Sequence, residues 1–166
     1  MEIQRVKRKK TVVVVSGGFD PLHIGHVRLF NEARKLGDTL VVILNNDNWL
    51  MAKKGCAFMS EQDRKEILES LRAVDEVILT KHKKNDGDRS VCRELLKLRP
   101  DIFANGGDRT PSDAKRKTSP LNPEVALCKR LGIKTVFNVG KGGKVRSSSN
   151  LVARFQKSQK QDILKE

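Results

Sequence analysis

Residues 12–26 read VVVVSGGFDPLHIGH, and this stretch decides the fold. The four valines at 12–15 form a continuous β-branched run, which predicts a strand buried on both faces. Two glycines interrupt it, and residues 24–36 then show the apolar spacing of a helix that stops at the next glycine. The start of a helix carries unpaired backbone N–H groups and the positive end of the helix dipole. A strand that turns directly into a helix therefore predicts an anion site at the turn.

The rest of the chain repeats this order of strand and helix. Further strands are expected at residues 39–45, 74–79, 101–105 and 134–139, and further helices from Ser60 and over residues 91–98, 124–131 and 147–156. Residues 45–55 and 110–123 are expected to be loops. The alternation predicts an α/β fold, a Rossmann-like three-layer sandwich of about five parallel strands in the order 3-2-1-4-5. Such a sheet binds ligands beyond the carboxyl ends of its strands, so the segments after the strands are expected to line one crevice.

The chain has 166 residues, and we place one domain at residues 11–156, between a basic lead-in at 1–10 and a charged tail at 157–166. Both ends are expected to be solvated. Lysine and arginine number 34 against 20 acidic residues, which gives a net charge of +14. Such a charge implies an anionic partner: a nucleotide, a phosphate ester, nucleic acid or an anionic membrane. Tyrosine is absent and tryptophan occurs once, so a stacked aromatic platform for single-stranded nucleic acid is not expected.

No transmembrane segment is expected, because no run approaches the ~18 apolar residues needed to span a membrane. The three cysteines are far apart and form no C-x-x-C motif. This pattern predicts neither disulfides nor a structural zinc site, and it favours a reducing, cytoplasmic location. His82 lies in a run of lysines and is expected on the surface.

Two of the three histidines, His23 and His26, fall at the first turn of the helix that follows the first strand. There both imidazoles can donate to the oxyanion that the helix N–H groups bind. Gly17 and Gly18 are expected to let the backbone approach a phosphate closely, and Gly25 is expected to leave room beside a nucleotide. The residues therefore predict a phosphate-binding turn.

The pattern Gly-x-Phe-Asp-x-x-His-x-Gly-His over residues 17–26, followed by a helix, resembles the signature of the cytidylyltransferase-like nucleotidyltransferases. The small single-domain shape is most similar to glycerol-3-phosphate cytidylyltransferases and to the sugar-phosphate nucleotidyltransferases. The resemblance implies that His23 and His26 are catalytic and stabilise the α-phosphate of a nucleoside triphosphate. The nucleotide-binding residues that it implies here are Gly17, Gly18, Phe19, Asp20 and Gly25. Asp20 either faces the metal–triphosphate group or braces the turn.

Two later segments resemble the family in the same order along the chain. Lys53 and Lys54 are similar in position to lysines that hold the phosphates of the reacting substrates, and Lys54 is implied as catalytic. A solvated loop is the alternative. Residues 72–77, RAVDEV, resemble a segment linked to nucleotide binding and to the dimer contact, which implies a nucleotide-binding Arg72. A buried pair of Arg72 with Asp75 is the alternative.

Residues 105–108 resemble the glycine turn of the family, and residues 146–149 resemble its Ser/Thr run, whose hydroxyls hold the β- and γ-phosphates. The nucleotide-binding residues that these segments imply are Gly107, Asp108, Arg146, Ser147, Ser148 and Ser149. Ser147 is also a candidate N-cap. The Arg-Thr pair usual before the run is replaced by a Gly/Lys stretch. The candidates to replace the function of that arginine are Lys141, Lys144 and Arg146.

The resemblance predicts an enzyme that transfers a nucleoside monophosphate from CTP or ATP to a phosphorylated small molecule and releases pyrophosphate. CMP is favoured and AMP is the alternative. Mg²⁺ is expected to arrive with the triphosphate, nucleic acid is not the expected partner, and a homodimer is implied. Two other interpretations stay open. One is a fragment similar to class I aminoacyl-tRNA synthetases, which share an H-I-G-H signature; the other is a non-catalytic module that binds nucleic acid or an anionic membrane, with a steep dependence on salt.

Overall fold

The computed structural model describes residues 9–106, 112, 122–140 and 147–163. Within these residues one parallel sheet has the strand order β3-β2-β1-β4-β5. The strands are β1 (Val12–Gly17), β2 (Thr39–Leu44), β3 (Glu76–Leu79), β4 (Ile102–Gly106) and β5 (Lys134–Val139). The predicted class, parallel sheet and strand order are confirmed.

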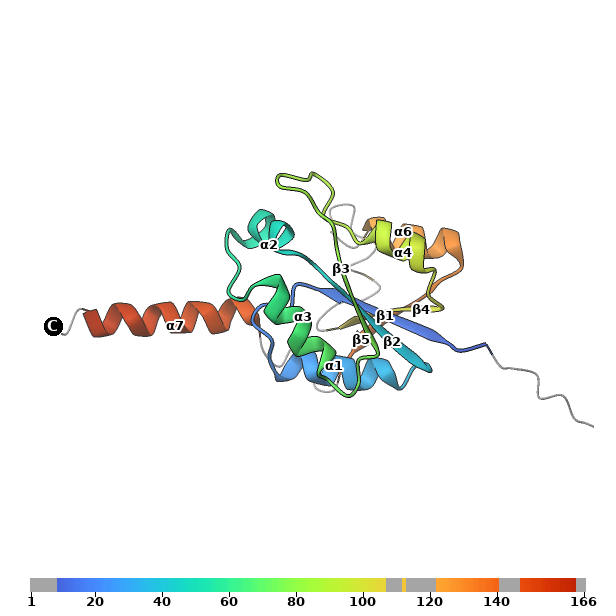
Figure 1. Cartoon of the computed structure of the whole chain (residues 1–166), viewed down its shortest axis with the longest axis horizontal. Helices are drawn as coiled ribbons and strands as arrows, with labels where there is room; N and C mark the ends of the chain where they lie inside the picture. Colours follow the sequence, from blue (N-terminus) through green and yellow to red (C-terminus); the bar gives the residue numbers. More distant parts are fainter. Residues whose placement is uncertain (1–8, 107–111, 113–121, 141–146, 164–166) are drawn as a thin grey trace, which may run out of the picture.

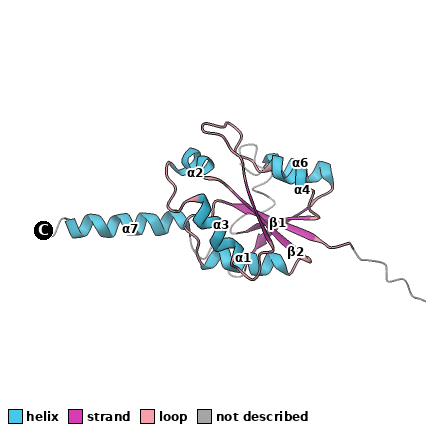
Figure 2. Ribbon diagram, in the orientation of Figure 1, coloured by secondary structure: helices cyan, strands magenta, loops and turns pink. Residues whose placement is uncertain are grey.

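Helices cover both faces of this sheet, as Figures 1 and 2 show. On one face lie α1 (Ile24–Arg34) and α3 (Glu61–Glu69), which bury Phe30 and Leu68 against Val13 and Val15. On the other lie α4 (Cys92–Leu98) and α6 (Asn122–Leu131), which bury Leu95 and Leu127 against Val14. The valines of β1 thus alternate between two cores, as a strand buried on both faces requires.

Two segments differ from the sequence prediction. Residues 47–54, expected in a loop, form α2 (Asp47–Lys54). The side chain of Asn46 caps this helix by accepting from the Trp49 N–H, and Gly55 ends it at φ 78°, so two local signals outweigh the polar composition. The last helix, α7 (Ser148–Ile163), continues past residue 156 into the tail that was expected to be solvated. Figure 1 shows α7 projecting from the body of the domain.

Helices α1 and α3 of the first half and helices α4 and α6 of the second half lie on opposite faces. The change of face falls between β1 and β4, the point where open α/β sheets bind ligands beyond the carboxyl ends of their strands. Within the described part of the chain, no helix is long and apolar enough to cross a membrane.

Candidate active site

His23 and His26 meet at the start of α1, on the carboxyl edge of the sheet. His23 is the N-cap residue, and its Nδ1 accepts from the Gly25 N–H at 3.1 Å. The Nδ1 of His26 accepts from the His23 N–H at 3.3 Å, which completes a reciprocal capping box. The two rings stack with centroids 3.7 Å apart. The sequence therefore places both imidazoles in one fixed arrangement at the predicted anion site.

These hydrogen bonds also assign the ring protons. An Nδ1 that accepts from a backbone N–H carries no proton, so in His23 and His26 the proton is on Nε2. Burial lowers the pKa of His26 to about 3, with further contributions from the electrostatic influence of His23 and of Lys54. At neutral pH His26 is therefore an uncharged imidazole with one Nε2–H donor. Fixed donors of this kind suit an oxyanion that develops charge during a reaction.

Phe19 and Gly25 set the positions of the rings. Phe19 is 5% exposed, and its ring packs edge-on against His26 and Phe30, each with a centroid separation of 5.1 Å. It is also the left-handed residue of the turn, at φ 48°. A Cβ on Gly25 would lie 2.9 Å from the His23 ring, so Gly25 leaves room for that imidazole. We had expected this space beside Gly25 to be taken by a nucleotide, and that contact stays a prediction.

Gly17 and Gly18 are likewise explained by packing. A Cβ on Gly17 would meet the ring of Phe19 at 2.9 Å, and a Cβ on Gly18 would meet the side chain of Leu50 at 2.8 Å. Both glycines therefore let side chains of the site close over the backbone of the turn. Their close approach to a phosphate stays a prediction.

Asp20 ties the turn to the segment before α3. It is 3% exposed, and its two carboxylate oxygens accept from the N–H groups of Phe58 at 2.7 Å and Met59 at 2.8 Å. This is the bracing role that the sequence left open. Within the described residues, no group of three or more His, Cys, Asp or Glu side chains could hold a metal ion. Mg²⁺ remains expected as the companion of a triphosphate.

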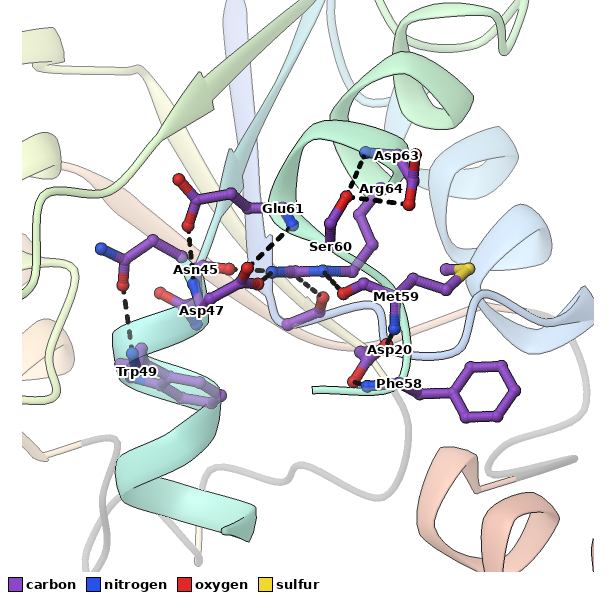
Figure 3. A network of polar contacts seen from close by, with 12 residues as sticks. Asp20, Asn45, Asp47, Trp49, Phe58, Met59, Ser60, Glu61, Asp63 and Arg64 are labelled. Atoms are coloured by element: carbon purple, nitrogen blue, oxygen red, sulfur yellow. Dashed lines mark hydrogen bonds and ion pairs between the residues drawn. The ribbon is translucent and has the colours of Figure 1, made fainter. Parts of the chain in front are cut away.

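Arg64 of α3 lies at the centre of the loops that carry the site (Figure 3). Its fully buried side chain donates to the carbonyl oxygens of Gly18 at 2.6 Å, Asn45 at 2.8 Å and Met59 at 3.2 Å. It also pairs with the Asp47 carboxylate at 2.6 Å. The guanidinium thus joins the segments after β1 and β2 to the segment before α3.

Arg64 was not among the predicted site residues. One signal could have found it. Arg64 precedes Leu68 by four residues, and both are buried, so it lies on the helix face that points to the sheet.

The two lysines expected at the substrate phosphates end α2. Lys54 donates to the backbone oxygen of Asp20 at 2.9 Å, beside the residues that position the histidines. The Nζ of Lys53 lies 4.4 Å from the centroid of the Trp49 ring. Both lysines are exposed. The structure therefore brings Lys54 to the histidine turn, whereas Lys53 lies along α2.

The serine run joins the same turn at its first helical residue. The Ser148 hydroxyl donates to the Pro21 backbone oxygen at 3.1 Å, and Ser147 and Ser149 flank it. The remaining predicted residues of these segments, Gly107, Asp108, Arg146, Lys141 and Lys144, lie outside the described residues. Arg72 is exposed and precedes β3, at the amino edge of the sheet, so the structure does not bring it to the histidines.

Two expectations about polar residues are wrong. Asp75 pairs with Arg34 at 3.3 Å and accepts from the Leu40 N–H, so a buried pair of Arg72 with Asp75 is not formed. His82, expected on the surface, is 6% exposed. Its Nε2 lies 3.1 Å from the Ser90 backbone oxygen and its Nδ1 lies 2.9 Å from the Thr80 hydroxyl. These bonds to its own loop bury the ring despite its lysine neighbours.

The comparisons with known proteins agree with this geometry. The family model described as cytidylyltransferase-like matches residues 14–154, so the chain belongs to this family of nucleotidyltransferases. The chain is 39% identical over 123 residues to an FAD synthase of Pyrococcus horikoshii, a match that covers 72% of the chain and 79% of that relative.

Two further similarities extend the comparison. The chain is 43% identical to a bifunctional protein HldE of Syntrophotalea carbinolica over 67% of its own length, but it spans only 22% of that relative. A solved lipopolysaccharide core biosynthesis protein of Thermoplasma volcanium shares 28% identity and a TM-score of 0.62, with 80% of this chain and 98% of that one covered.

Replacement of Arg64 should destabilise the domain. Arg64→Met leaves the Asp47 carboxylate and three backbone carbonyls without their donor, and the free energy of unfolding should fall by about 3–5 kcal/mol. Urea denaturation measures this loss. Lys65→Met, the same change at the next residue, should stay within about 0.5 kcal/mol of the original chain. Equal stability of the two variants would contradict the role of Arg64.

The His26 imidazole should make the stability depend on pH. Its pKa is about 3 in the folded chain and 6.5 in the unfolded chain, so only the unfolded chain takes up this proton between those values. The stability present above pH 6.5 is therefore lost as the pH falls, by roughly 2 kcal/mol at about pH 5. His26→Gln keeps a capping-box side chain but removes the imidazole. Urea denaturation should show a smaller loss in this variant; parallel profiles would rule the effect out.

Proposed function

We propose that this chain transfers a nucleoside monophosphate from a nucleoside triphosphate to a phosphorylated small molecule and releases pyrophosphate. The observation that carries the proposal is the pair of Nε2–H donors of His23 and His26 at the carboxyl edge of the sheet. The membership of the cytidylyltransferase-like family supports the same reaction class.

In this reaction an oxygen of the acceptor phosphate attacks the α-phosphorus of the triphosphate. The bond from the α-phosphorus to the oxygen bridging to the β-phosphate breaks, and pyrophosphate leaves with that electron pair. A phosphate monoester is largely a dianion at neutral pH, so its oxygen needs no general base. The main obstacle is the repulsion between two polyanions. The site overcomes it by positioning the substrates and by stabilising their negative charge.

The described residues divide this work. His23 and His26 donate to the oxygens of the α-phosphate through Nε2. Because His26 is neutral before the reaction, it stabilises the growing charge without trapping the ground-state triphosphate as a cation would. Lys54, exposed beside them and fixed on the Asp20 oxygen, attracts the acceptor phosphate. Ser148, whose hydroxyl donates to the Pro21 oxygen, binds the β- and γ-phosphates in the proposed arrangement.

The donor nucleotide and the acceptor are the finer part of the proposal. The sequence resemblance favours CTP. The relatives named FAD synthase favour ATP, because FAD carries an adenylyl group. The names of the relatives also favour a sugar phosphate or a flavin phosphate as acceptor. Mg²⁺ would accompany the triphosphate and neutralise part of its charge. The homodimer stays a prediction from the family.

Loss of either histidine should abolish most of the activity. Removing one well-aimed donor costs about 10²–10³ in rate, so His23→Ala and His26→Ala should lower turnover by about two orders of magnitude or more. The assay is pyrophosphate release with CTP, ATP, GTP and UTP against a panel of phosphorylated metabolites.

Each variant also loses part of the α1 cap, at a cost of ~0.5–2 kcal/mol, so thermal unfolding must first show that it is folded at the assay temperature. Asn31→Ala, on the exposed side of α1, is the control and should keep full turnover. Turnover near that of the original chain in either histidine variant would refute the proposed role.

A further inference from the structure

Polar residues lie at or just after the ends of four neighbouring strands, beside the face that α4 and α6 cover. Val14 of β1, Ile43 of β2, Ile78 of β3 and Phe103 of β4 all face this side. Side chains alternate along a strand, so the residues two positions further on face the same side. Those residues are Ser16, Asn45, Thr80 and Asn105. Hydrophobic side chains thus give way to polar ones at the carboxyl edge of the sheet.

Two of these side chains are buried with an unpaired polar atom. Asn45 is 3% exposed and Asn105 is 7% exposed. Within the described part of the chain, Asn45 Oδ1 and Asn105 Nδ2 are buried and have no hydrogen-bond partner. Thr80 differs, since its hydroxyl accepts from the Asn46 N–H and contacts His82. An unpaired buried amide atom is costly, and native structures retain few of them.

Two hydrogen bonds hold the backbone of Asn45 in place. Its backbone N–H donates to the Gly17 oxygen at 2.9 Å, and its backbone oxygen accepts from Arg64 at 2.8 Å. Asn105 lies within β4, which pairs with β1 at Ile102 and Phe103 and with β5 on either side of Asn105, at Ala104 and Gly106. The backbone contacts of Asn45 and the position of Asn105 in β4 thus fix where the two side chains start before a ligand arrives, as in a preorganised binding site.

The two amides flank the strand that leads to the histidines. β2 and β4 are the neighbours of β1, and in their registers with β1 Asn45 lies two residues further along the sheet than Asn105, so the two residues are about 12 Å apart. A phosphorylated sugar or polyol spans such a distance. The histidines begin α1, on the opposite face, so a ligand at the carboxyl edge can reach the histidines and the amides together.

We propose that Asn45 and Asn105 bind hydroxyl groups of the acceptor, which makes the acceptor a polyhydroxylated phosphate. This inference rests on the function proposed above. A hydroxyl both donates and accepts, so it pairs with either atom of an amide, whichever way that amide is turned. A bare alkyl chain or a quaternary ammonium group offers no such partner and would leave both amide atoms unpaired.

The position of Asn45 indicates that these hydroxyls belong to the acceptor and not to the nucleotide. It immediately precedes the segment that forms α2, and α2 ends at Lys54, which we assign to the acceptor phosphate. The phosphate and the hydroxyls would then be bound by a single strand–helix unit. The class includes glycerol 3-phosphate, sugar phosphates and FMN, whose ribityl chain carries hydroxyls beside the phosphate. It excludes phosphocholine and alkyl phosphates.

Calorimetric titration tests the proposal with named probes. Glycerol 3-phosphate, glucose 1-phosphate and FMN are compared with propyl phosphate and phosphocholine on the full chain and on Asn45→Leu and Asn105→Leu. We expect at least one hydroxylated probe to bind about tenfold more tightly than both others, and we expect either leucine to abolish that preference. Asn31→Leu, the same change at an exposed position on α1, should keep it.

Thermal unfolding of the same variants separates binding from structure. Leucine is close to asparagine in shape and removes the unpaired atom, so neither variant should melt below the original chain. If one does not fold, the other variant and the probe preference of the original chain still decide. Equal binding of all probes, no binding of any probe, retention of the preference in both leucine variants, or an effect confined to the affinity for ATP or CTP would overturn the inference.

The reaction assay keeps this inference distinct from the proposed function. If the proposed function fails, no nucleotide and acceptor pair releases pyrophosphate, whereas the preference of the binding site for hydroxylated phosphates is still measurable. If only the inference fails, pyrophosphate release proceeds, but propyl phosphate or phosphocholine serves as well as the hydroxylated acceptors.

Discussion

The buried guanidinium of Arg64 is the contact on which the carboxyl edge of the sheet depends. The three backbone carbonyls that it binds belong to three loops, which it holds at fixed distances from one another. Burying a charge is costly unless it is paired and fully hydrogen-bonded, and here Asp47 supplies the pair. Asp20 adds a second brace between the same loops, with both oxygens on backbone N–H groups. The histidine turn, α2 and the Asn45 amide all inherit their positions from these two contacts.

The proposed chemistry depends on an imidazole that donates a hydrogen bond while it is uncharged. Capping of α1 requires an acceptor at each Nδ1, and this leaves the proton of each ring on Nε2. Burial then keeps His26 uncharged near neutral pH by lowering its pKa. The capping of α1 and the burial of the His26 ring thus produce the Nε2–H donors that the proposed reaction uses. Lys54 carries positive charge beside them without placing a cation in the ring stack.

Sequence patterns predicted the parts of the molecule that local physics dictates. The valine run of β1, the strand order and the histidines at the start of α1 are confirmed because periodicity, turn glycines and the connection rules determine them. The roles of Arg64 and His82 were missed because both lie among charged residues that are typical of a surface. Only contacts with residues far along the chain, such as Gly18 for Arg64, bury such side chains. The unpaired amides of Asn45 and Asn105 could not be predicted either, since an unpaired atom is defined by everything around it.

The central claim is that His23 and His26 present Nε2–H to a nucleotide phosphate and that the His26 ring is uncharged at neutral pH. Long-range proton–nitrogen correlation NMR of the histidine rings at neutral pH tests it most directly, with the signals assigned from single-histidine variants. The account predicts the Nε2–H pattern for both rings and a shift of both sets of signals when ATP or CTP is added. A charged ring, a proton on Nδ1 in either residue, or signals that do not change with any nucleotide would contradict it.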